Sequence, residues 1–544
     1  MTALRRFRVV GWIALGCWVA VATTGCRTGR SLTVLAINDV YRIEGIDEGA
    51  SGGLARVRTL REELERDDPN VLVLHAGDAL YPAMLSRLYD GGQMVDVLNH
   101  LDGDAEAFDE RMFMTFGNHE LDASKLEDAS GLSRQVAASQ FRWLSSNIVF
   151  KRDGGQPLVS ADNLLPRAVV EIGGIRVGLF ALTTDMKSAA YIESFGDPLE
   201  VARESVARLR SDGAEVVIGL THLTLREDTT ILRELGADGP DVIFGGHEHE
   251  RQSAEVGGRW VLKADAEART ATVARLRPRR HGPPRIEARY RKLDARIHPD
   301  AAVAAVVEGW IERFDREYCA RLDEPPGCLD QPLGRAATDL IGEELQIRRF
   351  ETNFGDWIVD RALAAYAGEG AQIAFLNSGG LRLNRNLPAG TRITRRHVEE
   401  LFAYPTRLVL LRLDGATLAK ALAHAVTDWT GNGHWLQVAG LAFVHDPDSG
   451  TASRLTLLTA DGARPIAPDE ELLVVTNEFL VDPSGGQDGF AMLGPGQVVA
   501  RDPSRDLKRL VVEALVAAGE DGIPPRSEGR ICNPRRPGPC LATP

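Results

Sequence analysis

The sequence predicts a layered α/β protein with two domains joined by a connector helix. Three observations support this prediction. Short apolar runs alternate with helix-like stretches between residues 31 and 297, an amphipathic segment follows them, and a second α/β pattern fills most of the remaining chain. The 544 residues are 44% hydrophobic and 26% charged, which is ordinary globular composition and enough chain for two separate cores.

The first domain, residues 31–297, repeats an apolar run that ends in a polar residue and leads into a helix. Six such runs are LTVLAIND, NVLVLHAGD, RMFMTFGNHE, RVGLFALTT, EVVIGLTH and DVIFGGHEH. Strands that are apolar throughout indicate a sheet covered by helices on both faces. Ligands in such architectures collect at the carboxyl ends of the strands, where these polar residues lie.

A connector is expected over residues 298–345, because the α/β pattern breaks near 277–300 and a new periodicity begins. Its apolar residues recur at helical spacing: Val303, Val306, Val307, Trp310 and Phe314. Residues 346–518 then read as a smaller α/β domain, and residues 519–544 as an irregular tail.

The N-terminus reads as a signal peptide over residues 1–26. Three arginines precede an apolar stretch from Val9 to Ala22, which is too short to span a membrane. The run that ends in Cys26 resembles a lipoprotein signal, whereas the sequence Ala-Val-Ala ending at Ala22 resembles an ordinary cleavage site. We expect an exported protein in the periplasm or at the outer membrane surface, in contact with the membrane only through a lipid on Cys26. The sequence leaves the oligomeric state open.

The formal net charge of -14 repels polyanions, so polymeric DNA or RNA is an unsuitable partner, whereas a small anionic substrate needs only local positive charge. Four cysteines remain after the signal region. In an oxidising compartment the simplest of their three possible connectivities pairs Cys319 with Cys328 and Cys532 with Cys540, and the alternative is four unpaired thiols.

The polar residues at the strand ends form the ligand set of a two-metal hydrolase. One carboxylate must bridge two cations while oxygen and imidazole ligands hold each ion. Mixed nitrogen and oxygen ligation suits Zn²⁺, Mn²⁺, Fe or Co. The six candidates are Asp39, Asp78, Asn118, His222, His247 and His249.

The order of motifs, ND, GD, GNHE, TH and GGHxH, resembles that of calcineurin-like metallophosphoesterases, and specifically the 5′-nucleotidase and UDP-sugar hydrolase family. The resemblance implies a four-layer β-sandwich flanked by helices in the first domain. It also implies a role for each ligand: Asp39 and His249 hold the first metal, Asn118, His222 and His247 hold the second, and Asp78 bridges. In GNHELD, His119 and Asp122 would form a catalytic dyad that stabilises charge on the phosphoryl group or the leaving oxygen.

The first motif departs from the family, which has Asp-X-His where this sequence has Asp39-Val40-Tyr41. A tyrosinate binds Fe³⁺ well, so Tyr41 is one candidate ligand. Tyr81 is another, because GDALY is similar to the GDxxY motif of purple acid phosphatases. In a third interpretation neither tyrosine is a ligand and both pack with their hydroxyl groups bonded to a neighbour.

The second domain resembles the 5′-nucleotidase C-terminal domain through the segments RRFETNFGDWIVDRAL, LNSGGLR, LFAYPTRLV and NEFLVDPSGGQDGF. The resemblance implies that guanidinium groups bind a substrate phosphate or carboxylate, that two aromatic rings sandwich a nucleobase, and that a carboxylate bonds the ribose hydroxyls. The residues concerned are Arg348 and Arg382 with Asn377, Gly379 and Gly380 for the anion, Tyr404 and Phe479 for the base, and Asp488 for the ribose. Tyr404 stands where the family has Phe, and Gln487 is inserted before Asp488.

These features predict an exported phosphoesterase that uses two metal ions, Zn, Mn or Fe, to hydrolyse a small phosphate ester, with nucleotides favoured. Two alternatives remain: the same metal centre acting on a cyclic nucleotide, UDP-sugar or sugar phosphate, or a lipoprotein that binds nucleotides without cleaving them. By resemblance, we expect a hinge near residues 325–347 that lets the two domains rotate.

Overall fold

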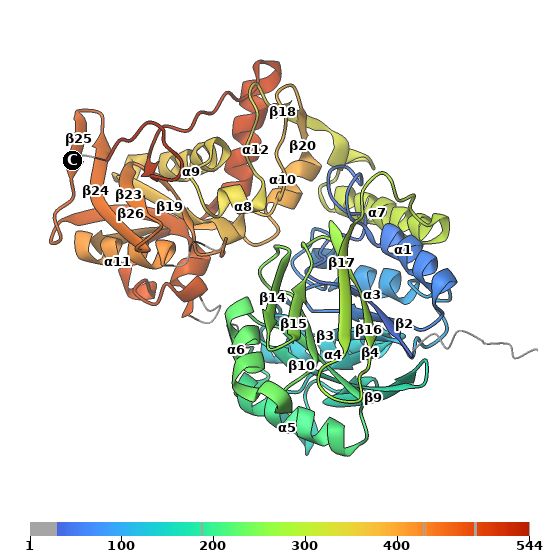
Figure 1. The fold of residues 1–544 in the computed structure, drawn as a ribbon. Helices are drawn as coiled ribbons and strands as arrows, with labels where there is room; N and C mark the ends of the chain where they lie inside the picture. Colours follow the sequence, from blue (N-terminus) through green and yellow to red (C-terminus); the bar gives the residue numbers. More distant parts are fainter. Residues whose placement is uncertain (1–29, 187–188, 428, 430, 484–486, 543–544) are drawn as a thin grey trace, which may run out of the picture.

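A computed structural model shows two α/β domains connected by a long helix, with the N-terminal domain in blue to green and the C-terminal domain in yellow to red (Figure 1). The structure describes residues 30–186, 189–427, 429, 431–483 and 487–542. The predicted signal peptide and Cys26 lie outside these described residues. Within them, no helix is both long and apolar enough to cross a membrane.

The N-terminal domain is built on two large sheets, beside two small two-stranded ones. The larger has the strand order β17 (Arg285–Lys292), β16 (Thr270–Arg277), β1 (Leu32–Ile37), β2 (Val71–His75), β3 (Met112–Thr115), β4 (Arg142–Leu144) and β8 (Leu164–Leu165). The smaller has the order β14 (Gln252–Val256), β15 (Arg259–Lys263), β13 (Val242–Gly245), β12 (Val216–His222), β10 (Ile175–Thr183) and β9 (Arg167–Ile172).

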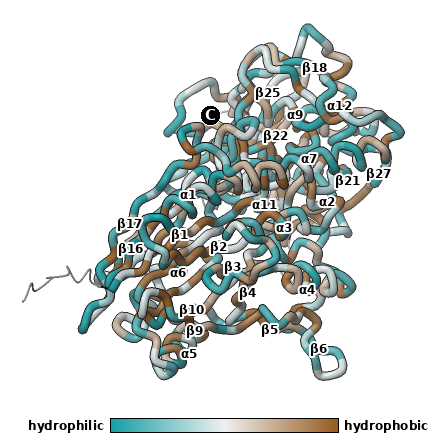
Figure 2. The backbone as a smooth tube through the Cα atoms, turned by 90° about the vertical axis from the view of Figure 1, so that its right-hand side faces the viewer, coloured by the Kyte–Doolittle hydropathy of each residue, from teal (hydrophilic) through white to brown (hydrophobic). Residues whose placement is uncertain are grey.

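The sheets pack face to face, and helices cover their outer faces. Apolar side chains of both sheets, including Val34, Leu72, Leu179 and Phe244, form the core between them. A second core joins the larger sheet to α1 (Leu54–Asp67), α3 (Gly92–Asn99) and α4 (Ala129–Ala138), and a third joins the smaller sheet to α5 (Pro198–Ser211) and α6 (Leu225–Leu235). In Figure 2, brown, apolar segments run through the region of β1, β2 and β10 in the interior. The predicted four-layer sandwich is therefore confirmed.

Strand direction brings the polar ends of the strands together. β1, β2 and β3 are parallel, as are β10, β12 and β13 in the other sheet. Parallel strands place their carboxyl ends at one edge, so the loops that follow them meet there. The residues that the sequence placed at strand ends therefore share one end of the sandwich.

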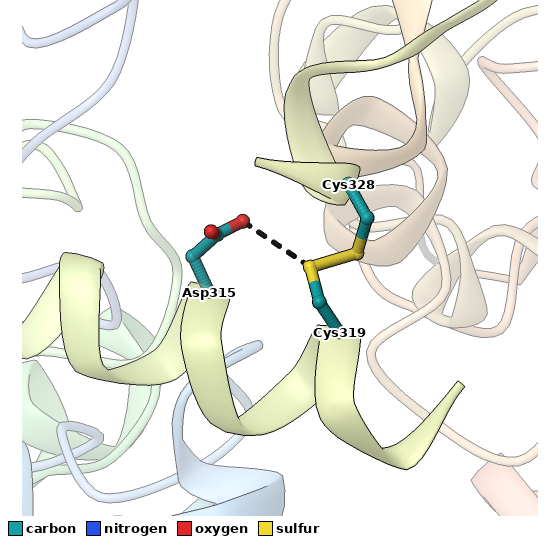
Figure 3. A group of neighbouring side chains, drawn as sticks. All are labelled: Asp315, Cys319 and Cys328. Carbon is teal, nitrogen blue, oxygen red and sulfur yellow. Dashed lines mark hydrogen bonds between the residues drawn. A yellow bond between two sulfur atoms is a disulfide. The ribbon is translucent and has the colours of Figure 1, made fainter. Parts of the chain in front are cut away.

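The connector is α7 (Ala301–Arg321), which agrees with the helical spacing in the sequence. Its buried face, with Val303, Val307 and Phe314, packs on the core of the N-terminal domain. Cys319 near its end forms the predicted disulfide with Cys328, with Asp315 beside the sulfur (Figure 3). Metal binding by cysteine needs a thiolate, and both sulfur atoms here are in a disulfide. The bond therefore links the end of the connector to the segment that follows it and does not form a metal site.

The C-terminal domain is built on a five-stranded sheet in the order β22 (Leu436–Ala439), β19 (Ile373–Asn377), β26 (Glu471–Asn477), β21 (Arg407–Asp414) and β27 (Val498–Asp506). Helices α9 (Asn353–Ala365), α10 (Arg395–Leu401) and α12 (Leu507–Ala518) contribute to the core on one face, and α11 (Gly415–Val426) to the core on the other. A four-stranded sheet of β23, β24, β25 and β28 borders the domain: Leu441–Asp446, Thr451–Thr459, Gly462–Pro465 and Ile531–Cys532. The second predicted disulfide, between Cys532 and Cys540, ties the tail to it.

Candidate metal centre and substrate cavity

Three of the predicted ligands converge beneath the interface between the domains. One ligand atom each from Asp39, Asp78 and His249 lies within 4.8 Å of the other two, and all three side chains are buried. The closest measured pair is His249 Nε2 and Asp39 Oδ1, at 3.4 Å. Two buried carboxylates this close repel each other unless a cation lies between them, so the cluster has the charge and spacing of a metal site.

The second group of ligands adjoins the first through Asp78. His222 Nε2 lies 3.2 Å from Asp78 Oδ2, and His247 Nδ1 lies 3.1 Å from Asn118 Oδ1. His222 donates its Nδ1 proton to the carbonyl oxygen of Ala76 at 2.7 Å, which leaves Nε2 directed at the carboxylates. This fixed tautomer is the one a histidine ligand needs.

The electrostatics of His222 also suit a cation. Its burial opposes a charged imidazole, but Asp78 and Asp39 more than offset that effect and raise the pKa of His222 to about 10. Without a metal the cluster therefore keeps a proton on this histidine. A cation that replaces the proton satisfies the same carboxylates, and metal binding then releases the proton.

The backbone is strained where these ligands are attached. Four non-glycine residues adopt positive φ angles: Asp39 at 52°, Asp78 at 59°, His247 at 90° and His249 at 61°. Each such residue costs of the order of 1–3 kcal/mol, and such strain gathers at functional sites. A side chain at Gly117 could not be accommodated either, because its Cβ would lie 2.1 Å from Asp78 Oδ1.

Two buried ionic groups hold these loops in place. Glu120 accepts hydrogen bonds from the backbone N–H groups of Asp78, Ala79, Leu80 and Gly117, and so joins the GD loop to the GNHE loop.

Behind the loops, the ammonium group of Lys263 donates to the carbonyl oxygens of Leu223 and Gly246, which adjoin two of the ligand histidines. The same group pairs with the carboxylates of Glu248 at 2.6 Å and Asp228 at 3.1 Å. Lys263 therefore fixes the backbone on which the histidines are mounted.

Tyr41 belongs to the cluster. Its hydroxyl oxygen lies 3.1 Å from Asp78 Oδ2 and 2.9 Å from His249 Nε2, and the side chain is buried. Two ligands of one metal ion, each bound at about 2.0–2.2 Å, lie about 3–3.5 Å apart. The separations of the Tyr41 oxygen from Asp78 and His249 match that spacing. Burial, followed by the charges of Asp78 and Asp39, raises the pKa of Tyr41 well above its usual value, so the phenol is neutral in the absence of a cation.

Tyr81 lies in a different environment. It packs against the hydrophobic core, and burial together with Asp90 and other carboxylates raises its pKa above the usual value. No ligand of the cluster is among those carboxylates. Of the two tyrosines, Tyr41 is the one whose oxygen contacts predicted ligands.

The two residues of the predicted dyad are hydrogen-bonded to each other. His119 Nδ1 donates to Asp122 Oδ2 over 2.9 Å, within and just after the short 3₁₀ helix η1 (His119–Leu121). The other ring nitrogen, Nε2, faces Arg382 of the C-terminal domain, whose Nη2 lies 3.1 Å away. The imidazole is thus held by its own loop through Nδ1 and is also contacted by the second domain at Nε2.

The C-terminal domain contacts the candidate ligand cluster directly through Glu344, at the start of α8 (Glu344–Ile347). Its Oε1 accepts a hydrogen bond from His249 Nδ1 at 2.7 Å and lies 2.9 Å from Arg348 Nη2. Although burial opposes ionisation, Arg348 and His249 hold the pKa of Glu344 well below its usual value. A carboxylate from one domain therefore orients a ligand of the other.

Other polar contacts cross the same boundary. Arg42 Nη2 donates to the carbonyl oxygens of Arg382 at 2.7 Å and Leu383 at 3.1 Å, and Arg349 pairs with Glu250 at 2.6 Å. Besides Glu344, the charged side chains of Arg42 and Arg349 therefore also join the two domains.

A cavity of about 670 Å³ opens between the domains, within the usual size range of ligand sites. Its lining includes residues from both sides: Asp78, Asn118, His119, His247 and His249 from the N-terminal domain, and Arg348, Asn377, Gly379, Gly380, Arg382, Tyr404, Phe479 and Asp488 from the C-terminal domain. Every residue that the sequence assigned to substrate therefore faces one space with four of the six candidate metal ligands. Asn377 Nδ2 donates to Asp488 Oδ2 at 2.6 Å, so the proposed ribose acceptor is itself held in place.

Tyr404 makes a contact in addition to lining the cavity with Phe479. Its hydroxyl is 3.0 Å from both Asp122 Oδ2 and His119 Nδ1, so the side chain reaches the dyad. The sequence offered no signal for this contact, nor for Glu344, because both join segments more than 90 residues apart. Glu120, in contrast, lies within GNHE and was accessible from the motif.

Comparisons with known proteins agree with this architecture. The model of the calcineurin-like phosphoesterases matches residues 32–251, and that of the 5′-nucleotidase C-terminal domain matches residues 332–495. Human 5′-nucleotidase is 26% identical over 97% of this chain and 93% of its own length.

Two solved structures from Thermus thermophilus share the whole fold. The 5′-nucleotidase precursor of this bacterium has a TM-score of 0.78 and 24% identity, covering 93% of this chain and 100% of that one. Its sulfate thiohydrolase SoxB has a TM-score of 0.70 and 18% identity, covering 94% of this chain and 97% of that one.

The fold and the ligand cluster define a calcineurin-like metallophosphoesterase, a class that works with divalent metal ions. With its second domain included, the chain belongs to the 5′-nucleotidase family and is a phosphoric ester hydrolase.

Proposed function

We propose that this chain is an exported phosphomonoesterase that holds two metal ions and releases phosphate from nucleotides. The observation that supports the proposal is the shared cavity, in which four candidate metal ligands of one domain and the arginines, Phe479 and Asp488 of the other line the same space. A substrate can therefore offer its phosphate to the ligand cluster while its remaining part contacts the second domain.

The chain's own residues divide the work as follows. When bound, two cations supply the Lewis acidity that activates water and offsets charge on phosphoryl oxygens. Asp39, Tyr41 and His249 would hold one ion and Asn118, His222 and His247 the other, with Asp78 between them. The guanidinium groups of Arg348 and Arg382, both buried, orient the anionic group.

His119 and Asp122 would act on the leaving group of the phosphate ester. The carboxylate of Asp122 accepts the Nδ1 proton, so a positive charge on the imidazole is stabilised when Nε2 carries a proton. From that nitrogen the proton can be given to the leaving oxygen. His119→Ala should then lower kcat by about 10²–10⁴-fold, whereas an unchanged kcat would contradict the role.

Export is supported by the two disulfides, since such bonds persist in oxidising compartments outside the cytoplasm. A signal peptide over residues 1–26 with a lipid on Cys26 would deliver the chain there. Mass spectrometry of the mature N-terminus tests this: an acylated Cys26 supports the anchor, and an unmodified end after Ala22 replaces it with simple secretion.

The substrate is tested with a panel of AMP, UDP-glucose, cyclic AMP, ribose 5-phosphate and p-nitrophenyl phosphate, on protein loaded separately with Zn²⁺, Mn²⁺ or Fe. Faster release from AMP than from ribose 5-phosphate supports nucleotide recognition. Equal rates on the two esters favour a second candidate function, a phosphatase that does not recognise the base. The contact of Tyr404 with the dyad also favours this candidate, because the contact does not involve a base. No turnover by folded, metal-loaded protein would refute the enzyme and favour a nucleotide-binding lipoprotein.

A further inference from the structure

Tyr404 brings a hydroxyl group from the C-terminal domain to the dyad of the N-terminal domain. It follows α10 and lines the cavity, half-buried. Its oxygen lies 3.0 Å from Asp122 Oδ2 and 3.0 Å from His119 Nδ1, and those two atoms are 2.9 Å apart. The hydroxyl therefore contacts both members of the dyad at the bond that joins them.

The proton of this hydroxyl points to the carboxylate. Burial, together with the charge of Asp122, raises the pKa of Tyr404 well above its usual value, so the phenol keeps its proton. The hydroxyl then donates a hydrogen bond to Asp122. Asp122 Oδ2 then accepts from both Tyr404 and His119. A carboxylate held by two donors from different domains has little freedom to rotate away from the imidazole.

The ring of Tyr404 is also engaged. The guanidinium carbon of Arg382 lies 5.6 Å from the ring centroid, within the distance of a cation–π contact. Arg382 in turn reaches His119 Nε2. Both ends of the imidazole are thus approached by C-terminal side chains that also touch each other.

We propose that Tyr404 is a positioning residue of the dyad: its hydroxyl holds Asp122, and through it His119, in the orientation that faces the phosphoryl group. The inference rests on the proposed phosphomonoesterase function. The hydroxyl of Tyr404 can reach Asp122 only while the C-terminal domain lies against the N-terminal domain, so the dyad is held in this orientation only in that arrangement. Because the dyad acts on the phosphoryl group and its leaving oxygen, the contribution of Tyr404 is the same for esters with and without a nucleobase.

The test is Tyr404→Phe, which removes one oxygen atom and keeps the ring that a base could stack on. AMP and ribose 5-phosphate form a matched pair of substrates that differ chiefly in the base. We expect kcat to fall by about 10- to 100-fold on both, the loss of one hydrogen bond to a charged group, with KM unchanged within about twofold.

Tyr318→Phe is the matched control, because the hydroxyl of Tyr318 on α7 bonds to Glu399 on α10 at 2.6 Å, outside the substrate cavity. It removes a tyrosine–carboxylate bond from the same domain boundary and should leave kcat unchanged. Thermal unfolding and metal content, measured on each variant, show that fold and metal site are retained.

A double-mutant cycle of Tyr404→Phe with Asp122→Asn tests whether Tyr404 affects kcat through Asp122. If Tyr404 acts through Asp122, the two losses in kcat are non-additive, and Tyr404→Phe costs little more in the Asp122→Asn background. Three results would overturn the inference: an unchanged kcat, additive losses, or a KM increase confined to AMP, which would make Tyr404 a base platform. A wild-type protein that releases no phosphate from either ester would instead refute the proposed function, and the inference with it.

Discussion

Glu344→Gln tests whether the C-terminal domain tunes the metal site. The substitution keeps the shape of the side chain and removes its charge. Glu344 Oε1 accepts from His249 Nδ1 at 2.7 Å, and the glutamine oxygen can still accept from the same proton. The change therefore weakens one oriented hydrogen bond to a candidate ligand without opening a cavity.

The size of the effect follows from that bond. A hydrogen bond to a charged group contributes about 1.5–3 kcal/mol, and a neutral one roughly half as much. Losing about 0.8–1.5 kcal/mol corresponds to about a four- to twelvefold weaker metal affinity, near the lower end of the usual effect of changing a residue that supports a ligand. Arg348 also loses the carboxylate 2.9 Å from its Nη2, so the melting temperature should fall as well.

Equilibrium dialysis against buffered Mn²⁺ or Zn²⁺, with metal analysis of the retained protein, measures the affinity directly. Glu343→Gln is the control, because Glu343 caps α8 by accepting from the N–H of Gln346 and a glutamine there can still accept. Its affinity should stay within about twofold of wild type. Equal affinities for wild type and Glu344→Gln, or equal losses in both variants, would refute the coupling.

Three further predictions concern other residues. If Tyr41 is a ligand, iron-loaded protein should show a visible phenolate-to-iron absorption band that Tyr41→Phe abolishes, and a colourless iron-loaded wild type would exclude the ligand. Lys263→Met leaves the buried Asp228 and the half-buried Glu248 without their cation, so chemical denaturation should show a loss of about 3–5 kcal/mol, and a loss below about 1 kcal/mol would contradict this role of Lys263. Burial, followed by the nearby Glu351 charge, raises the pKa of Asp356 to about 9. The folded state therefore binds this proton more tightly than the unfolded state, and the group's stabilisation, complete below about pH 4, is lost as the pH rises towards 9. The stability of Asp356→Asn relative to wild type should thus increase between about pH 5 and 9, and a pH-independent difference would contradict the shift.

The convergence of the candidate ligands was predictable because they share a local signature. Asp39, Asp78 and His222 each follow an apolar run, and parallel strands must bring such ends to one edge. The helical spacing of the connector and the short intervals between cysteines were equally local, and α7 and both disulfides follow from them.

The contacts between the domains were beyond reach of the sequence. Glu344 reaches a ligand 95 positions away, and Tyr404 reaches Asp122 over 282 positions, with no repeat or periodicity to relate them. Both depend on how the domains pack against each other, which local propensities do not encode. The resemblance assigned Tyr404 to a nucleobase, and only the three-dimensional arrangement shows where its hydroxyl points.

We expect phosphate ester hydrolysis by this protein to depend on two cations held by one ligand cluster. The direct measurement is the rate of phosphate release from AMP as a function of metal bound per chain, on protein first stripped with a chelator. We predict negligible release without metal and a rate that rises to a plateau at two equivalents. A full rate in metal-free protein, or a plateau at one equivalent, would contradict it.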